Sequence, residues 1–423
     1  MSQTDAHLAV LGVTSAAGAV GQASAAQYSG RRNNVRRVHN LFGTSAAAII
    51  LRFLVATPRT ASDHFAAISD EQHRHRDIVF LNITESRFNC ALKYVVWFQH
   101  CRQVFSTARF WLVADDDTFI QLEHLASELH TLPAHGHVMW GLVMWYAAPS
   151  KTSIRLSPAT WLTCRYPFYD NVSMVTHHEW GGWQYSDRGA VRARRRIEEC
   201  QAAQRRDRSC YKRLGRGALD AIEHNGLADD VPPYPVVNGP MFAVSRSLGA
   251  LIAQDRLPHI FQEQLSQTAR VKAAMSRPGG PRKSNIACWP VSDATLGYWI
   301  SRIASARNLT LTLVNSPFMV QHHPWPALVH GAFSNSSIVL HGLKKERNQR
   351  KFYDLALRRG MGPFVPFRRK CGNCAALGWS SWPGSPVSHW QCCGCDLAGE
   401  SKVQCNERML GGTKVQGFAH SPG

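Results

Sequence analysis

The sequence lacks any stretch that approaches the roughly 20 consecutive apolar residues of a membrane-spanning helix. Its opening residues also lack a basic segment followed by a long apolar core, which a secretory signal peptide would carry. The opening run LAVLGVTSAAGA is short and rich in small residues, so we interpret it as a first buried strand with the loop that follows it. If the protein acts in the lumen of an organelle, we expect the segment that anchors it to the membrane to be supplied elsewhere.

Acidic residues are also scarce, because 29 Asp and Glu face 48 Lys and Arg, which gives a formal net charge of +19. That balance suits a polyanionic partner such as nucleic acid, an anionic membrane or a phosphorylated substrate. The excess is concentrated in RRNNVRR, near residue 31, and in the stretch from Arg188 to Arg216. Neither run interleaves the aromatic residues on which single-stranded nucleic acids stack. We therefore interpret both as solvated basic loops or insertions and do not expect a nucleic-acid partner.

The length and composition indicate a folded protein with a sizeable core. A chain of 423 residues exceeds the roughly 250–300 at which a single core tends to split. Strand-like apolar runs alternate with helical patterns along the first two-thirds of the chain: LAVLGV, AIILRFLVA, DIVFL, the helical FNCALKYVVWFQHC, RFWLVA and VMWGLVMW. This order predicts an α/β fold, in which helices cover a sheet.

Two predicted helices have a clear apolar face. In the first, Phe88, Ala91, Leu92 and Val95 recur at helical spacing, and in the second Leu296, Trp299, Ile300 and Ile303 do the same. Ser292 is a plausible N-cap of the second helix, which would place Asp293 in its first turn. A carboxylate there would lie at the positive end of the helix dipole.

Three consecutive aspartates, Asp115, Asp116 and Asp117, follow the apolar run RFWLVA directly. Carboxylates at the end of a central strand stand where open α/β sheets bind their ligands. Three adjacent anions repel one another, and a divalent cation offsets that repulsion. Mg²⁺ and Mn²⁺ commonly bridge carboxylates to phosphates, so a nucleoside diphosphate is the natural companion. A solvated acidic turn is the alternative to a metal site.

Histidines could complete such a metal site. The candidate ligands are His322, His323 and His341.

Several motifs, in order, resemble the inverting β1,3-glycosyltransferase family, which includes β1,3-galactosyltransferases, β1,3-N-acetylglucosaminyltransferases and Fringe proteins. The blocks DIVFLNITESRFNCALKYVVWFQHC and RFWLVADDDTFIQLEHL are similar to the family's "DI…D…DSY.NLTLKT…W…C" pattern and its DDD. RRNNVRR resembles the element "R.AIR.TW", PPYPVVNGPMFAVSR resembles "YP.YCSG.GYVLSR", and SIVLHGLKK resembles "LVH..KP". Cysteine is missing from the segment that corresponds to "CSG". The resemblance covers about residues 8–355, with a basic insert at about 186–230.

The resemblance implies a GT-A (Rossmann-like nucleotide-sugar-binding) fold, a UDP-sugar donor and a Mn²⁺ ion. Carried over by position, it makes Asp117 and His341 metal ligands, while Asp115 and Asp116 would contact ribose, donor sugar or metal-bound water. Gly239 would let the backbone approach a substrate closely. Asp293, in SDATLGYW, matches the second acid of the family's base element, whereas Ser292 replaces the first.

The activity implied is transfer of galactose or N-acetylglucosamine to a hydroxyl of a glycan or glycoprotein, in the Golgi and in association with a membrane. The alternative for Asp293 is a helix-capping carboxylate. The alternative for the chain is a non-catalytic binding protein, either an inactive glycosyltransferase fold or a basic zinc-ribbon nucleic-acid binder.

The tail is rich in cysteine, and we expect it to form a separate module over residues 368–410. The spacing of Cys371, Cys374, Cys392 and Cys395 is typical of a zinc ribbon. Disulfides and free thiols are the alternatives, and Cys393 and Cys405 complicate any pairing scheme. The total of twelve cysteines and the four Asn-x-Ser/Thr sequons, at Asn82, Asn171, Asn308 and Asn335, favour an oxidising compartment.

Overall fold

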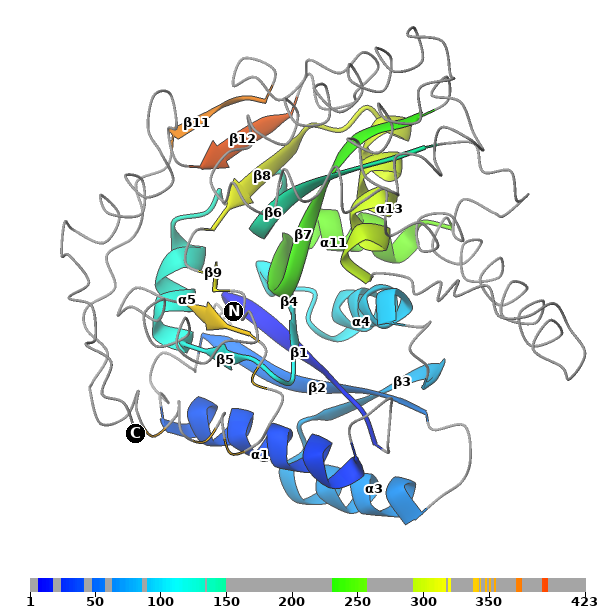
Figure 1. Ribbon diagram of the computed structural model, residues 1–423, viewed down its shortest axis with the longest axis vertical. Helices are drawn as coiled ribbons and strands as arrows, with labels where there is room; N and C mark the ends of the chain where they lie inside the picture. The colour runs from blue at the N-terminus through cyan, green and yellow to red at the C-terminus, as the bar shows by residue number, and fades with distance from the viewer. Residues whose placement is uncertain are drawn as a thin grey trace, which may run out of the picture.

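The computed structural model describes a mixed α/β architecture (Figure 1). The described residues are 7–17, 24–41, 48–57, 63–85, 90–133, 135–149, 230–256, 292–316, 319–320, 338–341, 343, 347, 350, 354, 370–374 and 390–394. The basic stretch from Arg188 to Arg216 lies outside these residues, as do Phe88, His322, His323, Cys395 and Cys405.

The first part of the chain builds four parallel strands with helices between them. In chain order these are β1 (Ala9–Ser15), α1 (Ala25–Leu41), β2 (Ile49–Thr57), α3 (Asp63–His75), β3 (Ile78–Thr84), α4 (Cys90–Val104) and β4 (Phe110–Asp115). The strands stand in the order β4-β1-β2-β3, and each neighbouring pair is parallel. The α/β fold expected from the alternating apolar runs is confirmed.

The sheet continues beyond β4 with strands from later in the chain. These are β6 (His137–Pro149), β7 (Asp230–Ser245), β8 (Leu311–Asn315), β11 (Lys370–Asn373) and β12 (Gln391–Gly394). The nine strands follow the order β11-β12-β8-β6-β7-β4-β1-β2-β3, in which β7 is antiparallel to both β4 and β6. A second, three-stranded sheet has the order β5-β10-β9 and consists of β5 (Phe119–Ile120), β9 (Met319–Val320) and β10 (Val339–Leu340).

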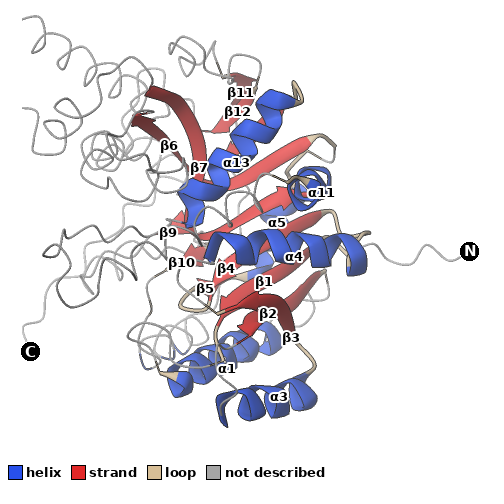
Figure 2. Cartoon of the chain, turned by 90° about the vertical axis from the view of Figure 1, so that its right-hand side faces the viewer, coloured by secondary structure: helices blue, strands red, loops and turns tan. Residues whose placement is uncertain are grey.

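Two apolar cores lie on opposite faces of the large sheet. On one face the side chains of alternate strand residues pack with α1, α3 and α5 (Leu122–His130), and on the other face they pack with α4, α11 (Arg246–Gln254) and α13 (Ser292–Ala306). Figure 2 shows α4, α11 and α13 away from α1 and α3. The predicted helix faces are buried, including Ala91 and Val95 in α4 and Leu296 and Ile300 in α13. None of the described helices is both long enough and apolar enough to cross a membrane.

The basic run RRNNVRR is not the solvated loop that its charge predicted. It lies within α1, and the side chains of Arg31, Arg32 and Arg36 are buried. Each of the three forms an ion pair with a carboxylate of another segment. The charge pattern was misleading because a buried arginine and a solvated one look alike in sequence, and the acids that pair with this run come from distant segments.

The cysteine-rich tail contains two disulfides, which fit the expected Cys-rich module, and it pairs with the main sheet. Strands β11 and β12 form an antiparallel hairpin, and β12 pairs in parallel with β8, so these residues extend the main sheet and do not form a separate one. Disulfides join Cys371 to Cys393 and Cys374 to Cys392. A zinc site at Cys371, Cys374, Cys392 and Cys395 is therefore wrong for this structure, because a disulfide sulfur is not the thiolate that zinc requires. The disulfide alternative is the one the fold adopts.

Candidate active site

The three aspartates begin at the carboxyl end of β4, beside the carboxyl end of β1. In the order β3-β2-β1-β4 the chain leaves β1 toward β2 and β3 and then returns to the other side of β1, so the strand order reverses between β1 and β4. Open α/β sheets bind ligands at such a switch point. The last paired residues of the two strands are Thr14 and Asp115, and the Thr14 hydroxyl donates a 2.9 Å hydrogen bond to Asp115 Oδ1.

Pairing of the small sheet brings His341 to the aspartates. Leu340 of β10 pairs with Phe119 of β5, and the backbone N–H of Leu343 donates to the carbonyl oxygen of Asp117 at 2.9 Å. His341 Nε2 consequently lies 3.2 Å from Asp117 Oδ1 and 3.5 Å from Asp115 Oδ2. Potential ligand atoms of Asp115, Asp117 and His341 all lie within 4.8 Å of one another, so these residues could hold a metal ion.

The two carboxylates strongly favour the protonated form of His341. Burial alone opposes the imidazolium charge, but hydrogen bonds and Coulombic attraction from Asp115 and Asp117 outweigh it and raise the pKa of His341 to about 10. In this arrangement the proton of His341 neutralises part of the carboxylate charge. A divalent cation at the same place would have to displace that proton before Nε2 could become a ligand.

Asp116 faces the opposite side of the sheet, toward α1. Its side chain is buried, Oδ2 accepts a 2.8 Å hydrogen bond from the Ser15 hydroxyl, and Oδ1 accepts one of 3.1 Å from Arg31 Nη1. Burial raises the pKa of Asp116 to about 6, although Arg31 opposes that rise. Unlike its two neighbours, Asp116 therefore anchors the turn to α1, and the structure does not bring it into the group with His341.

A buried ion pair between α1 and α3 holds the residues at the end of β1 in place. The guanidinium of Arg32 forms two hydrogen bonds with the Glu71 carboxylate, at 2.8 and 2.6 Å. Arg32 Nη1 also donates to the Ser15 hydroxyl and to the carbonyl oxygen of Ala16. Because Ser15 in turn contacts Asp116, the position of the acidic turn depends on helices that lie outside the site.

Glu71 gives this support a predictable pH dependence. Burial alone would raise the pKa of Glu71, but Arg32 and Arg36 hold it below its usual range. A carboxyl with a lowered folded-state pKa contributes stability above its unfolded pKa of about 4.3, and that contribution is lost as the pH falls further. We expect Glu71→Gln to cost about 3 kcal/mol of unfolding free energy at pH 7. The deficit should shrink in denaturant titrations run below pH 4, and an equal deficit at every pH would contradict the assignment.

Gly239 occupies a bulge of β7 near the aspartates. Phe242 of β7 pairs with Gly141 of β6, but the next pair joins Asn238 to Leu142, so the register shifts across Gly239. On its other edge β7 pairs Met241 with Ala114, the residue before the three aspartates. A bulge re-aims the backbone next to a site. The expected close approach of backbone to substrate at Gly239 remains a prediction.

Asp293 comes to the same face of the sheet as Asp115. It lies in the first turn of α13, as predicted, and is partly buried. Helix α13 packs closely on β7 because Gly297 has no Cβ, and a Cβ there would lie 2.5 Å from the Pro235 carbonyl oxygen. Burial raises the pKa of the Cys90 thiol, and the carboxylates of Asp115 and Asp293 both add to that rise. Both acids are therefore within electrostatic range of Cys90.

Sequence reasoning assigned no role to Ser15, Arg31 or Lys93. Arg31 was visible only as part of the RRNNVRR element. Lys93 lies among buried apolar residues of α4, and its ammonium group donates to the Ser15 carbonyl oxygen at 3.0 Å and pairs with Glu85. A lysine amid buried residues was a usable signal, because an ammonium group is seldom buried without a partner.

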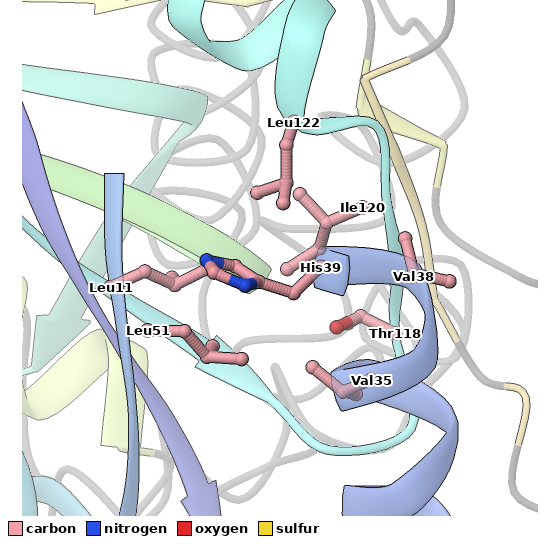
Figure 3. Close-up of a pocket in the computed structure, with 8 residues that line it drawn as sticks. All are labelled: Leu11, Val35, Val38, His39, Leu51, Thr118, Ile120 and Leu122. Atoms are coloured by element: carbon pink, nitrogen blue, oxygen red, sulfur yellow. The ribbon is translucent and has the colours of Figure 1, made fainter. Parts of the chain in front are cut away.

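A pocket between α1 and the sheet is a poor candidate for a polar substrate (Figure 3). Its lining is mostly apolar, and His39 Nε2 lies 3.2 Å from the carbonyl oxygen of Ile49. Thr118 points its hydroxyl at the carbonyl oxygen of Asp115, at 2.6 Å. The lining residues are Leu11, Val35, Val38, His39, Leu51, Thr118, Ile120 and Leu122.

Comparison with known proteins supports a glycosyltransferase. Residues 30–174 match the family described as Galactosyltransferase, which confirms the resemblance seen in the sequence over that region. No curated protein matches the chain. Among solved structures, the crystal structure of HddC from Yersinia pseudotuberculosis is similar at 12% identity and a TM-score of 0.20, over 36% of this chain and 66% of that one. The match thus spans just under two thirds of HddC.

Proposed function

We propose that the protein is a metal-dependent inverting hexosyltransferase of the β1,3 type. It would move galactose or N-acetylglucosamine from a UDP-sugar to a hydroxyl of a glycan or glycoprotein. The observation that carries the proposal is the convergence of Asp115, Asp117 and His341 at a strand end. Asp115 and Asp117 also lie within residues 30–174, which match a galactosyltransferase family. We further propose that residues 8–355 form a GT-A catalytic domain, and that the protein acts in the Golgi in association with a membrane.

The three side chains fit a divalent cation such as Mn²⁺. Two carboxylates and one imidazole form a mixed oxygen and nitrogen donor set, and both ligand types are compatible with first-row divalent metals. An ion with bonds of about 2.1 Å has adjacent ligands about 3 Å apart. The separations of 3.2 and 3.5 Å between His341 Nε2 and the two carboxylates are close to that value. Bound there, the ion would supply Lewis-acid neutralisation of a departing diphosphate.

The four acidic residues of the site would have two kinds of role, binding and proton transfer. Asp115 and Asp117 would hold the cation at the strand end, and Asp116 would keep the turn docked on α1 through Arg31. Asp293 would accept the proton of the acceptor hydroxyl as that oxygen attacks the anomeric carbon from the face opposite the leaving UDP. The position of Asp293 in the first turn of α13 favours its ionised form, which a base needs before reaction.

Metal binding should be linked to a proton of His341. Because the pKa of His341 is about 10 in the metal-free protein, Mn²⁺ would have to displace about one proton between pH 6 and 9. We expect Mn²⁺ affinity to rise by about tenfold per pH unit across that window. Isothermal titrations of the metal-free protein in buffers of different ionisation enthalpy would measure the released proton. The control is His341→Gln, in which affinity should be weaker and its pH dependence flatter.

The direct test of function is release of UDP from a panel of UDP-sugars by the purified protein, with and without Mn²⁺. Turnover of one donor that needs the metal supports the enzyme. The alternative is a non-catalytic binding protein, which could bind a UDP-sugar without turning it over. Absence of binding to any UDP-sugar, measured by titration, would rule out the proposed donor class.

A further inference from the structure

We propose that Asn82 carries an N-linked glycan whose first sugar packs against the aromatic ring of Phe80. The sequon is Asn82-Ile83-Thr84, and it lies at the end of β3. The side chains of Asn82 and Thr84 are both exposed, as acceptance of a glycan requires. The inference does not depend on the glycosyltransferase activity proposed above, because here the protein is the acceptor of a sugar and not the catalyst.

The exposed aromatics next to the sequon are the first structural argument. Among the described residues, the large apolar side chains that are exposed are Phe65, Phe80 and Val104. Phe80 is 39% exposed and Phe65 of α3 is 41% exposed, and their ring centroids lie 5.7 Å apart. The two adjoining rings form a small, partly exposed apolar surface that a sugar ring could cover.

The geometry of the strand places that surface beside Asn82. Side chains two residues apart on a strand point to the same face, so Phe80 and Asn82 share a face of β3. Helix α3 covers this face of β3. The ring of Phe65 in α3 contacts the ring of Phe80, and Ile78 belongs to the apolar core against which α3 packs. A sugar attached to Asn82 could therefore fold back over the Phe80 ring, with the carbon-bound hydrogens of the sugar against the ring face.

The backbone around Asn82 is also accessible. Strand β3 is the last strand of the large sheet, so one of its edges has no neighbouring strand among the described residues. Leu81 pairs with Ala56 and Thr84 with Thr57, which leaves Asn82 and Ile83 in an irregularity of the ladder. Exposed edge strands invite pairing with other chains, and a bulge or a bulky cover blocks that pairing. A glycan at Asn82 would cover this edge.

The disulfides of the β11–β12 hairpin are consistent with the required compartment. Disulfides persist in oxidising compartments, and the secretory route is also where N-linked glycans are added. The donor would be an oligosaccharide carried on a polyprenyl diphosphate. Asn82 Nδ2 forms a bond to the anomeric carbon and loses a proton, while the bond from that carbon to the diphosphate oxygen breaks and the polyprenyl diphosphate leaves.

The first experiment locates the glycan. The full chain is secreted from a eukaryotic host behind a cleavable leader, treated with peptide N-glycosidase in ¹⁸O water and analysed by peptide mass spectrometry. We expect ¹⁸O-labelled aspartate at position 82, absent in Thr84→Ala and retained in Thr84→Ser. An unmodified Asn82 in the secreted wild-type protein would overturn the proposal.

The second experiment tests the packing on Phe80 with a double-mutant cycle. Asn82→Gln should lower Tm by about 2–4 °C in the wild-type background and by much less in the Phe80→Ala background. If Asn82→Gln is not secreted, enzymatic removal of the glycan from the folded protein supplies the same comparison. Equal losses in both backgrounds would overturn the packing.

The matched control is Thr310→Ala, which removes the second described sequon and keeps Asn308. Asn308 is exposed, lies in a turn after α13 with φ 48° and begins the sequon Asn308-Leu309-Thr310, but Ala306 stands two positions before it in place of an aromatic residue. Thr310→Ala should leave Tm nearly unchanged, because it removes a sequon that has no aromatic residue beside it and does not alter the positive φ of Asn308. A Tm loss as large as that of Asn82→Gln would show that the aromatic ring plays no special part.

Discussion

Asp117→Asn is expected to lower both Mn²⁺ affinity and UDP-sugar turnover by at least about 100-fold, since even residues that only support metal ligands commonly contribute 10–100-fold. The substitution keeps the shape of the side chain and removes its charge. Asp117 Oδ1 lies 3.2 Å from His341 Nε2, so the loss would remove one of the carboxylates closest to the proposed ion. Mn²⁺ titration and UDP release on the same preparation provide the two measurements.

The control for Asp117→Asn is Glu123→Gln, which also removes one negative charge from the region that follows β4. Glu123 is exposed in the first turn of α5 and is not part of the group formed with His341. Mn²⁺ affinity and turnover of Glu123→Gln should stay within about twofold of wild type, because salt screens the charge of an exposed side chain. Wild-type Mn²⁺ affinity in Asp117→Asn would refute the metal site.

Asp293→Asn is expected to reduce kcat by about 10²–10⁴-fold, the usual contribution of a general base. Asparagine cannot accept the acceptor's proton, yet it can still occupy the first turn of α13. Mn²⁺ and UDP affinities should remain unchanged, because Asp293 is not one of the three clustered ligands. Steady-state kinetics with saturating donor, together with UDP titration, separates the loss of chemistry from a loss of binding.

The alternative role of Asp293 is to stabilise the helix start, and it predicts a different result. A carboxylate at a helix N-terminus contributes about 0.3–1 kcal/mol, so Asp293→Asn would then lower stability slightly and leave kcat near wild type. Ser292→Ala at the adjacent position serves as the control, with turnover expected to be retained. Full activity of Asp293→Asn would show that the base is another residue.

The sequence predicted the elements whose signals are local. Alternating apolar runs gave β1, β2, β3 and β4, and helical spacing gave the buried faces of α4 and α13, because the side-chain periods of strands and helices follow from backbone geometry. The apolar run RFWLVA placed the three aspartates after a buried strand, as the structure has them. The helical spacing that begins at Leu296 placed Asp293 at the start of a helix, where the structure also has it.

Features that depend on distant partners were missed. The buried state of Arg32 depends on Glu71 from another helix, and the sulfur of Cys374 is paired with Cys392 across a hairpin that joins β8. Neither partner can be chosen from spacing. The density of positive charge predicted that the Arg32 side chain would be exposed to solvent, whereas it is buried. The cysteine spacing was typical of a zinc ribbon, whereas these cysteines form disulfides.

By itself the sequence determined which residues carry charge at the end of β4. Only the tertiary structure decided which partner each of these aspartates contacts. Along a strand, neighbouring side chains alternate between the two faces of the sheet, and the turn that follows β4 continues this division. Asp116 meets Arg31 of α1, while Asp115 and Asp117 meet His341, which arrives through pairing of β10 with β5. A local pattern fixes the chemistry that is available, but packing between distant segments fixes which groups share one place.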